Sequence, residues 1–469
     1  MTEFLTIIPL LIPVGGLVIM AVLTDNNRKV VKAIPALSFL IPSLFLIYII
    51  FGMNTGSISI LTAQFFSLRF EINAFNIIFL LIISLGSTLL LTEAKDTGNI
   101  PSLMLTLIGS LWIIISRDIA GFVIAMTLII FQDAFVLLKS VEISKIDTGI
   151  EKFLLNIVTL FLIISGFIKI YSMTGSANFW NISQALIFVE PRDKILPLIL
   201  IASGILPHTG LFPFNTLTLS LKEKIPYQFI TTSIISSLSL IIATLFLTKR
   251  IFNLNNAVPF IIVIASITLI LSDMLIHIER GFKRNLIYIA LSEIAFFCIA
   301  LSEETFLSLP ISIVTTAILI ISTSSLIVLF DMKPSVNSVE STGINNNILR
   351  FFAYVFFISL SSLPPATTFM TRFITIQGFL KVNDALSIIV AIIIIGSVAS
   401  RSVFILRKIP QLKGPVFNDP DKRDLIIIVS LGTVIILISM MAVPIMESIE
   451  QFLNYLNVKA LTNPGGVYP

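Results

Sequence analysis

Runs of apolar residues, each long enough to cross the hydrocarbon core of a bilayer, constrain this chain more than any other feature. A bilayer-spanning helix needs about 20 mostly apolar residues, and such runs recur along all 469 residues. Only 12% of the residues are charged, about half the share found in soluble domains. The sequence therefore predicts an all-α polytopic membrane protein. It excludes a soluble enzyme, a disordered chain and a nucleic-acid-binding domain.

Short polar segments divide the apolar runs into fourteen predicted spans. Residues 54–73 are predicted to be a hairpin or a surface segment, and residues 178–194 a loop that does not span. The first run lacks a basic region and is too long for a signal peptide, so we expect a retained first span. The spans lie near 3–23, 33–53, 75–93, 100–116, 120–138, 150–171, 195–215, 228–248, 257–277, 285–302, 306–330, 351–379, 385–405 and 425–446.

The basic residues predict the orientation. Loops after odd-numbered spans hold more than twice as many Lys and Arg residues as the opposite loops. Because basic loops favour the cytoplasm, both termini are predicted to lie outside. The net charge of +4 follows from these loops.

Ionisable side chains within spans are rare, and they are the first candidates for function because a charge in hydrocarbon is costly. Asp273 and His277 lie four residues apart, on one face of their span. The candidates for an ion path are Asp133, Lys169, His208, Glu293 and Arg372.

Proline interrupts two spans in a similar way. Pro207, Gly210 and Pro213 break the seventh span, and Pro364 and Pro365 break the twelfth. Paired broken helices in two halves are typical of inverted-repeat transporters. Prolines that only kink the helices are the alternative, but an ionisable residue accompanies each break.

No sequence motif indicates a catalytic centre. The chain has two histidines and one cysteine, Cys298, which excludes an internal disulfide, an iron–sulfur cluster and a thiolate zinc site. We expect no cofactor, no metal and no catalytic residue. Within an enzyme, the chain would be a non-catalytic subunit.

Five segments, in order along nearly the whole chain, resemble the antiporter-like membrane subunits of respiratory complex I, Mrp-type Na+/H+ antiporters and membrane-bound nickel–iron hydrogenases. The resemblance implies fourteen helices with two inverted five-helix repeats, in which helices 7 and 12 are broken. It divides the chain at 1–99, 100–250, 251–410 and 411–469, with the repeats in the two middle parts. The segments are SRDIAGFVIAM, EKFLLNIVTLFLIISGFIKIYSMTGSANF, HTGLFPFN with LKEKIP, GFKRNLIYIALSEIA and SLPPATTFMTRF.

Few of the family's functional residues are retained. Only the basic residue of helix 12 keeps a charge, on Arg372, and an arginine holds its proton at physiological pH. Asp133 follows Thr127 by six residues and faces another side of the helix, so it does not replace the helix-5 glutamate directly. The altered positions are Thr127 (helix-5 glutamate), His208 (helix-7 lysine), Ser239 (helix-8 basic residue), Asn215 (the histidine of PFH) and Gly281 (the aspartate of DIKR).

The resemblance implies a subunit of a redox-linked complex that translocates H+ or Na+ across a prokaryotic cytoplasmic membrane, beside further antiporter-like subunits. The altered positions imply that its own channel is impaired or lost. Two alternatives stay open: a competent H+ or cation antiporter subunit with a rearranged polar path, and a stand-alone secondary transporter. Arg372 needs a partner to offset its burial, and Glu293 is the preferred one because it falls in the same repeat.

The orientation predicts that Lys413 faces the cytoplasm. A cysteine introduced there (Lys413→Cys) should react with a membrane-impermeant thiol reagent only where the cytoplasmic face is accessible. Labelling from the outside alone would contradict the orientation.

Overall fold

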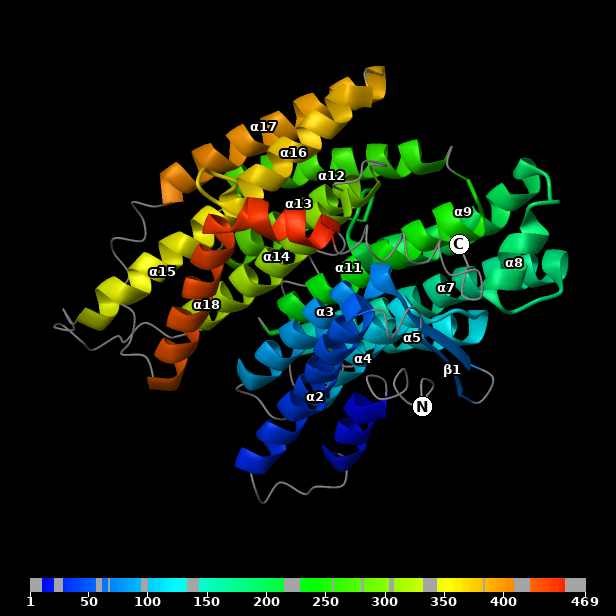
Figure 1. Cartoon of the computed structure of the whole chain (residues 1–469), viewed down its shortest axis with the longest axis horizontal. Helices are drawn as coiled ribbons and strands as arrows, with labels where there is room; N and C mark the ends of the chain where they lie inside the picture. Colours follow the sequence, from blue (N-terminus) through cyan, green and yellow to red (C-terminus); the bar gives the residue numbers. More distant parts are fainter. Residues whose placement is uncertain are drawn as a thin grey trace. The chain divides into compact units, whose positions relative to one another are not determined.

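The computed structural model describes residues 11–20, 28–55, 61–65, 68–93, 100–132, 143–214, 228–254, 257–279, 282–302, 308–331, 344–382, 384–408 and 422–451. The chain divides into two compact units, one formed mainly by residues up to Ile261 and one by Ile262–Glu450. Helices build both units, as Figure 1 shows. Their apolar composition accounts for this, because a backbone in hydrocarbon must satisfy its own hydrogen bonds.

The first unit is made of packed helix pairs. Helix α2 packs on α3, α4 packs on α5 and α11, and α7 packs along α9. A short π-helical segment, η2 (Leu247–Ile251), continues α11. The bounds are α2 (Arg28–Thr55), α3 (Ala74–Glu93), α4 (Ile100–Ile115), α5 (Ile119–Ile130), α7 (Ile143–Thr174), α9 (Pro191–Thr209) and α11 (Gln228–Phe246).

Two segments outside the predicted spans also have regular structure. Strands β1 (Leu61–Phe65) and β2 (Leu68–Ile72) pair antiparallel, so the segment at 54–73 contains the expected hairpin. The loop expected at 178–194 is wrong in part, because it contains helix α8 (Phe179–Leu186). Asn178 begins α8 by accepting a hydrogen bond from the Trp180 N–H at 2.9 Å, which is a typical N-cap.

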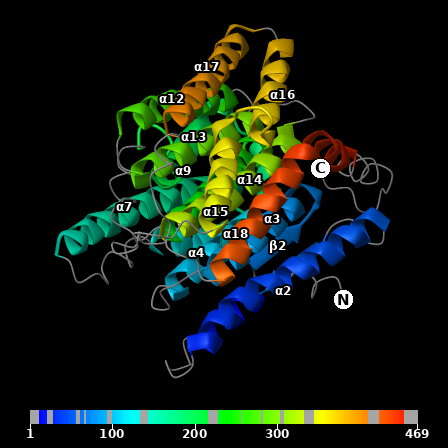
Figure 2. The same ribbon diagram turned by 90° about the vertical axis from the view of Figure 1, so that its left-hand side faces the viewer.

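The second unit holds most of the described helices that follow Ile261. Helix α13 packs on α14, α16 on α17, and α18 on both α14 and α15. Figures 1 and 2 show α16 and α17 running side by side. The bounds are α12 (Val258–Ile278, most of it in this unit), α13 (Phe282–Ser302), α14 (Ser308–Asp331), α15 (Ile344–Ser361), α16 (Thr367–Val382), α17 (Ala385–Lys408) and α18 (Lys422–Met440).

Helices end at both proline-containing segments. Helix α9 ends before Gly210, whose φ of 76° is left-handed and suits a residue without Cβ. Helix α15 ends at Ser361 and α16 begins at Thr367, so Pro364 and Pro365 lie between them. Proline cannot donate the N–H that a continuous helix needs, which explains the interruption.

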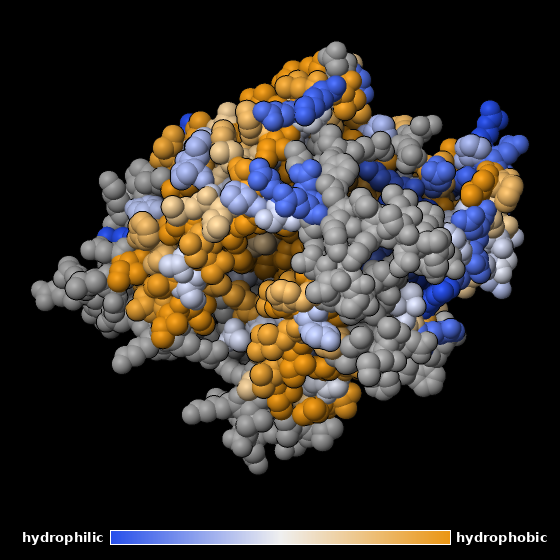
Figure 3. All heavy atoms as spheres, in the orientation of Figure 1, coloured by the Kyte–Doolittle hydropathy of each residue, from blue (hydrophilic) through white to orange (hydrophobic). Residues whose placement is uncertain are grey.

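A described helix overlaps each of the fourteen predicted spans, but the lengths of helix and span differ. Among the described residues, six helices are long and apolar enough to cross a membrane, and a seventh span would join Leu425–Met440 to Ala442–Gln451 across a 73° bend. The number of crossings and the inverted repeats therefore stay predictions. Hydrophobic side chains cover much of the face seen in Figure 3, as a surface in contact with lipid requires. The six are Ala33–Phe51, Gly149–Thr174, Ile230–Ile251, Val258–Ile278, Arg284–Ser302 and Ala385–Arg407.

Glycine allows α7 and α9 to approach closely. A Cβ atom added at Gly204 of α9 would lie 2.6 Å from the Thr159 backbone oxygen of α7. A Cβ atom added at Gly166 of α7 would lie 2.9 Å from the Pro197 backbone oxygen of α9. Small residues are common where membrane helices pack backbone to backbone.

Gly204→Ala should therefore lower the melting temperature of the purified protein, because the new methyl group would overlap both the Ile163 side chain and the Thr159 backbone oxygen, and the backbone cannot move aside easily. Overpacking of this kind costs about 1–3 kcal/mol. Gly396→Ala is the matched control, since Gly396 also lies within a helix and has nothing within 4 Å of an added Cβ. Equal melting temperatures for the two variants would refute the close approach.

Candidate functional site

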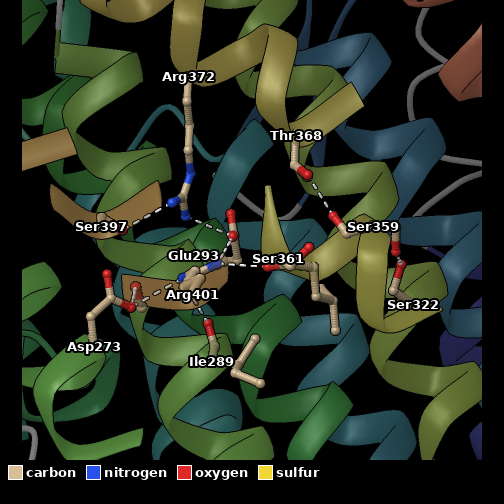
Figure 4. Close-up of polar contacts among 12 residues, drawn as sticks. Asp273, Ile289, Glu293, Ser322, Ser359, Ser361, Thr368, Arg372, Ser397 and Arg401 are labelled. Atoms are coloured by element: carbon tan, nitrogen blue, oxygen red, sulfur yellow. Dashed lines mark hydrogen bonds and ion pairs between the residues drawn. The ribbon is translucent and has the colours of Figure 1, made fainter. Parts of the chain in front are cut away.

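Four buried charged side chains meet in the second unit, and we call them the charge cluster. They are Asp273 of α12, Glu293 of α13, Arg372 of α16 and Arg401 of α17, each at most 4% exposed. Two positive charges face two negative ones, so the ionised set has no net charge. Figure 4 shows the four side chains converging from separate helices.

Arg401 makes the largest number of contacts in the charge cluster. Its Nε lies 3.0 Å from Asp273 Oδ1, and its Nη1 pairs with Glu293 Oε1. The same Nη1 donates to the Leu360 carbonyl at 2.8 Å, and Nη2 donates to the Ile289 carbonyl at 3.4 Å. One guanidinium therefore connects α12, α13, α17 and the end of α15.

Arg372 pairs with Glu293, the partner preferred from the sequence. Its Nη2 lies 2.9 Å from Glu293 Oε1, and its Nη1 donates to Ser397 Oγ of α17 at 2.9 Å. Its guanidinium carbon lies 5.0 Å from the centroid of the Phe296 ring, within range of a cation–π interaction. Glu293 is thus shared by two arginines.

Polar side chains of this unit donate hydrogen bonds to backbone carbonyls at the break between α15 and α16. Thr368 Oγ1 donates to the Ser359 carbonyl at 2.6 Å, and Arg401 donates to the next carbonyl, that of Leu360. The Ser359 and Ser322 hydroxyls lie 2.7 Å apart. The carbonyls next to the break bond to Thr368 and Arg401, and this arrangement holds the broken helix beside the charge cluster.

The first unit places His208 among neutral polar groups and one lysine. His208 Nε2 lies 3.0 Å from Thr159 Oγ1, and the His208 carbonyl accepts a hydrogen bond from Ser237 Oγ at 3.2 Å. Lys152, only 3% exposed, lies near enough to interact with His208 electrostatically. The Gln132 amide reaches Thr232 Oγ1 at 3.4 Å. These groups form a buried polar region within the first unit.

The other predicted site residues do not join either group. Lys169 is exposed on α7. The Thr127 hydroxyl donates to the Val123 carbonyl, and the Ser239 hydroxyl donates to the Ile235 carbonyl, each within its own helix. Pro207 is buried in the last turn of α9, Pro213 follows that helix, and both are near the His208 region in sequence. Outside the described residues lie Asp133, Asn215 and Gly281.

The sequence did not reveal the roles of Arg401 and Asp273. A signal was present, because each charge lies within an apolar run and must have a partner there. The partners lie more than 100 residues apart along the chain, and spacing within one helix does not identify them. Asp118 of the segment SRDIAGFVIAM has a structural role: its Oδ1 accepts from the Gly121 N–H at 2.6 Å and begins α5.

The comparisons with known proteins now decide the family. The family described as NADH:quinone oxidoreductase/Mrp antiporter, TM, matches residues 116–400, more than half of the chain. The chain belongs to this family. The resemblance found in the five sequence segments is therefore confirmed.

Two relatives of this antiporter family show how far the similarity extends. NADH-ubiquinone oxidoreductase chain 2 of Hyaloraphidium curvatum is 24% identical over 264 residues, which cover 55% of this chain and 59% of that protein. NADH-quinone oxidoreductase subunit N of Wolbachia sp. subsp. Brugia malayi (strain TRS) is 21% identical over 361 residues, which cover 73% of this chain and 76% of that protein. The chain thus matches less than two thirds of the first relative's length.

Solved structures with the antiporter-family fold match nearly the whole chain. A chain of the membrane-bound sulfane sulfur reductase (MBS), an archaeal respiratory membrane complex, matches with a TM-score of 0.82 at 15% identity and covers 97% of both chains. A chain of the Mrp complex from Dietzia sp. DQ12-45-1b matches with a TM-score of 0.78 at 12% identity and covers 97% of both chains. At these identities the likeness establishes the fold.

Arg401→Met should destabilise the protein strongly, because it leaves Asp273 and Glu293 with excess buried negative charge. Removing one partner of a buried ion pair costs about 3–5 kcal/mol. The melting temperature of the purified protein measures the effect. Arg407→Met is the matched control, since Arg407 lies on the same helix and is exposed. A control variant as unstable as Arg401→Met would contradict the assignment of Arg401 to the charge cluster.

Proposed function

We propose that the chain is an antiporter-like subunit of a multi-subunit, redox-linked complex that translocates H+ or Na+, and that its own channel is impaired. The observation that carries this proposal is the pairing of Glu293 with both Arg372 and Arg401. Arg372 is the position where the sequence resemblance places the basic residue of helix 12. A charge held in this way contributes to structure, and it does not carry protons.

Proton relay needs groups that gain and lose a proton during the cycle. Both basic residues of the charge cluster are arginines, which stay protonated at physiological pH. Glu293 lies between them, so protonating it would leave two buried positive charges facing one carboxylate. The pairing therefore favours a charge cluster whose protonation state stays fixed.

The first unit supports the same proposal. Thr127, at the position of the helix-5 glutamate, bonds within its own helix. Ser239, at the helix-8 position, does the same. His208 is the one titratable group among these three positions, and its ring lies beside the Thr159 hydroxyl. Two of the three family positions therefore carry a hydroxyl that does not titrate, which interrupts the path that the resemblance implies.

The proposal includes an architecture and a location. It comprises fourteen spans, two inverted repeats and both termini outside a prokaryotic cytoplasmic membrane. The boundary between the two compact units at Ile261 lies close to the expected boundary between the repeats, near residue 250. The matched chains belong to an archaeal respiratory membrane complex and to an Mrp complex, which favours membrane subunits as partners.

Purification of the tagged chain from its native membrane tests the assembly. We expect it to co-purify with other membrane subunits, identified by mass spectrometry. A monodisperse monomer with full transport activity in liposomes would overturn the proposal in favour of a stand-alone transporter.

Substitution of Arg372 tests the impaired channel. Arg372→Lys keeps the charge beside Glu293, so assembly and ion pumping should stay near the wild-type level. Arg372→Leu leaves Glu293 with one arginine and should weaken assembly. An Arg372→Leu complex that assembles normally, yet uncouples electron transfer from ion translocation, would show that the channel works.

A further inference from the structure

Three helices of the first unit form a groove that the charge cluster and the His208 region do not include. Helix α4 packs on α5, and α5 packs on α7; Figure 1 shows the three helices in neighbouring positions. The groove between them has a volume of about 290 Å³ and is partly open to the outside of the protein. Its lining includes Leu105 of α4, Thr127 and Leu128 of α5, Phe131 at the end of α5, and Phe153 of α7.

The polar groups of the groove are bonded within the protein. The Thr127 hydroxyl donates to a carbonyl of its own helix at 2.8 Å, and the Gln132 amide donates to Thr232 Oγ1 at 3.4 Å. At the end of α5, the Ile130 carbonyl accepts a hydrogen bond from Asn156 Nδ2 at 2.7 Å. Among the described residues, no side chain that lines the groove has a buried polar atom without a hydrogen-bond partner. The groove therefore has no polar atom that requires an ion or a water molecule.

Most of the groove wall is apolar. The rings of Phe131 and Phe153 pack edge to face, with centroids 5.4 Å apart, and connect the end of α5 to α7. Leu105 and Leu128 add aliphatic side chains from α4 and α5. An apolar cavity of about 150 Å³ stays free of water and takes up apolar ligands, and this groove has about twice that volume. The lining therefore favours an apolar occupant over water.

Exposed apolar side chains continue the groove onto the surface of the unit. Ile150 and Ile157 lie one turn before and one turn after Phe153 on α7, and they are 48% and 46% exposed. Ile124 lies one turn before Leu128 on α5 and is 41% exposed. A continuous apolar surface within predicted spans is the surface that meets the hydrocarbon chains of the bilayer. The groove is therefore supplied from the lipid and not from water.

The size of the groove restricts its occupant. An α-helix with its side chains is about 10–12 Å across, so a helix of a neighbouring subunit is too wide to enter a groove of about 290 Å³. A single hydrocarbon chain is narrow enough to enter. Ile100 begins α4 and Phe131 follows the last residue of α5, so the groove lies near the ends of these helices. By the predicted orientation, those ends face the cytoplasm.

We propose that this groove binds one acyl chain of a phospholipid from the cytoplasmic leaflet. Thr127 is the residue that keeps its wall uncharged. The sequence resemblance places the helix-5 glutamate at this position, and a carboxylate in the groove would need a partner to offset its charge. The Thr127 hydroxyl instead bonds to its own helix, which leaves an apolar surface for the chain. The inference concerns lipid binding and does not rest on the proposed function.

Photolabelling of the full chain in its complex, reconstituted in lipid nanodiscs, tests the site. The probe is a phosphatidylcholine with a photoreactive diazirine in its acyl chain, and mass spectrometry identifies the labelled residues. After exchange with an excess of unlabelled lipid, label should remain at Phe131 and Phe153, because a chain held in the groove leaves slowly. Label should be lost at Phe260, which is 72% exposed on α12 and does not line the groove.

Variants that fill the groove complete the test. Thr127→Phe should lower the retained label about tenfold, because its ring takes the place of at least two methylene groups of the chain. Leu105→Phe fills the groove from α4 and should act alike, so the test does not depend on one variant folding. Ile124→Phe is the matched control on α5, outside the groove lining, and should retain the wild-type level. Loss of the wild-type label on exchange, or label that persists in the filled variants, would overturn the proposal. Ion pumping is not measured, so failure here is distinct from failure of the proposed function.

Discussion

The burial of four formal charges in an apolar helical interior is the constraint on which the second unit depends. An isolated charge in such surroundings costs many kcal/mol, and Asp273, Glu293, Arg372 and Arg401 avoid that cost by neutralising each other. Sharing Glu293 between two guanidinium groups requires α13, α16 and α17 to keep a fixed arrangement. The charges therefore specify how these helices pack, in addition to any role in ion movement.

The same interaction holds the broken helix. Pro364 and Pro365 interrupt the hydrogen bonding between α15 and α16, and the Leu360 carbonyl finds its donor in Arg401. An apolar residue at position 401 would leave Asp273 without its arginine, Glu293 with Arg372 alone, and this carbonyl without its donor. Arg372, which the sequence resemblance places at the basic position of helix 12, is tied through Glu293 to Arg401. This is the physical basis for proposing an impaired channel.

Much of the fold could be predicted from the sequence, because the length of an apolar run indicates where a membrane helix lies, and proline indicates where it is interrupted. The pairing of Arg372 with Glu293 also followed from the need to neutralise a buried charge. The partners of Arg401 could not be predicted in this way. Asp273 and Glu293 both lie in apolar runs far from Arg401 along the chain, and no spacing in the sequence shows that Arg401 binds both. Helix α8 was missed because its amphipathic pattern is only two turns long. The surroundings of His208 depend on contacts between α7, α9 and α11, which no local pattern encodes.

A double-mutant cycle between Arg401 and Glu293 tests the central claim most directly. Melting temperatures of the assembled protein would be measured for Arg401→Met, Glu293→Gln and the combined variant. If the two side chains neutralise each other, the double substitution should lower the melting temperature by clearly less than the sum of the single effects, because it removes both buried charges together. Additive effects would show that the two residues act independently and would contradict the account.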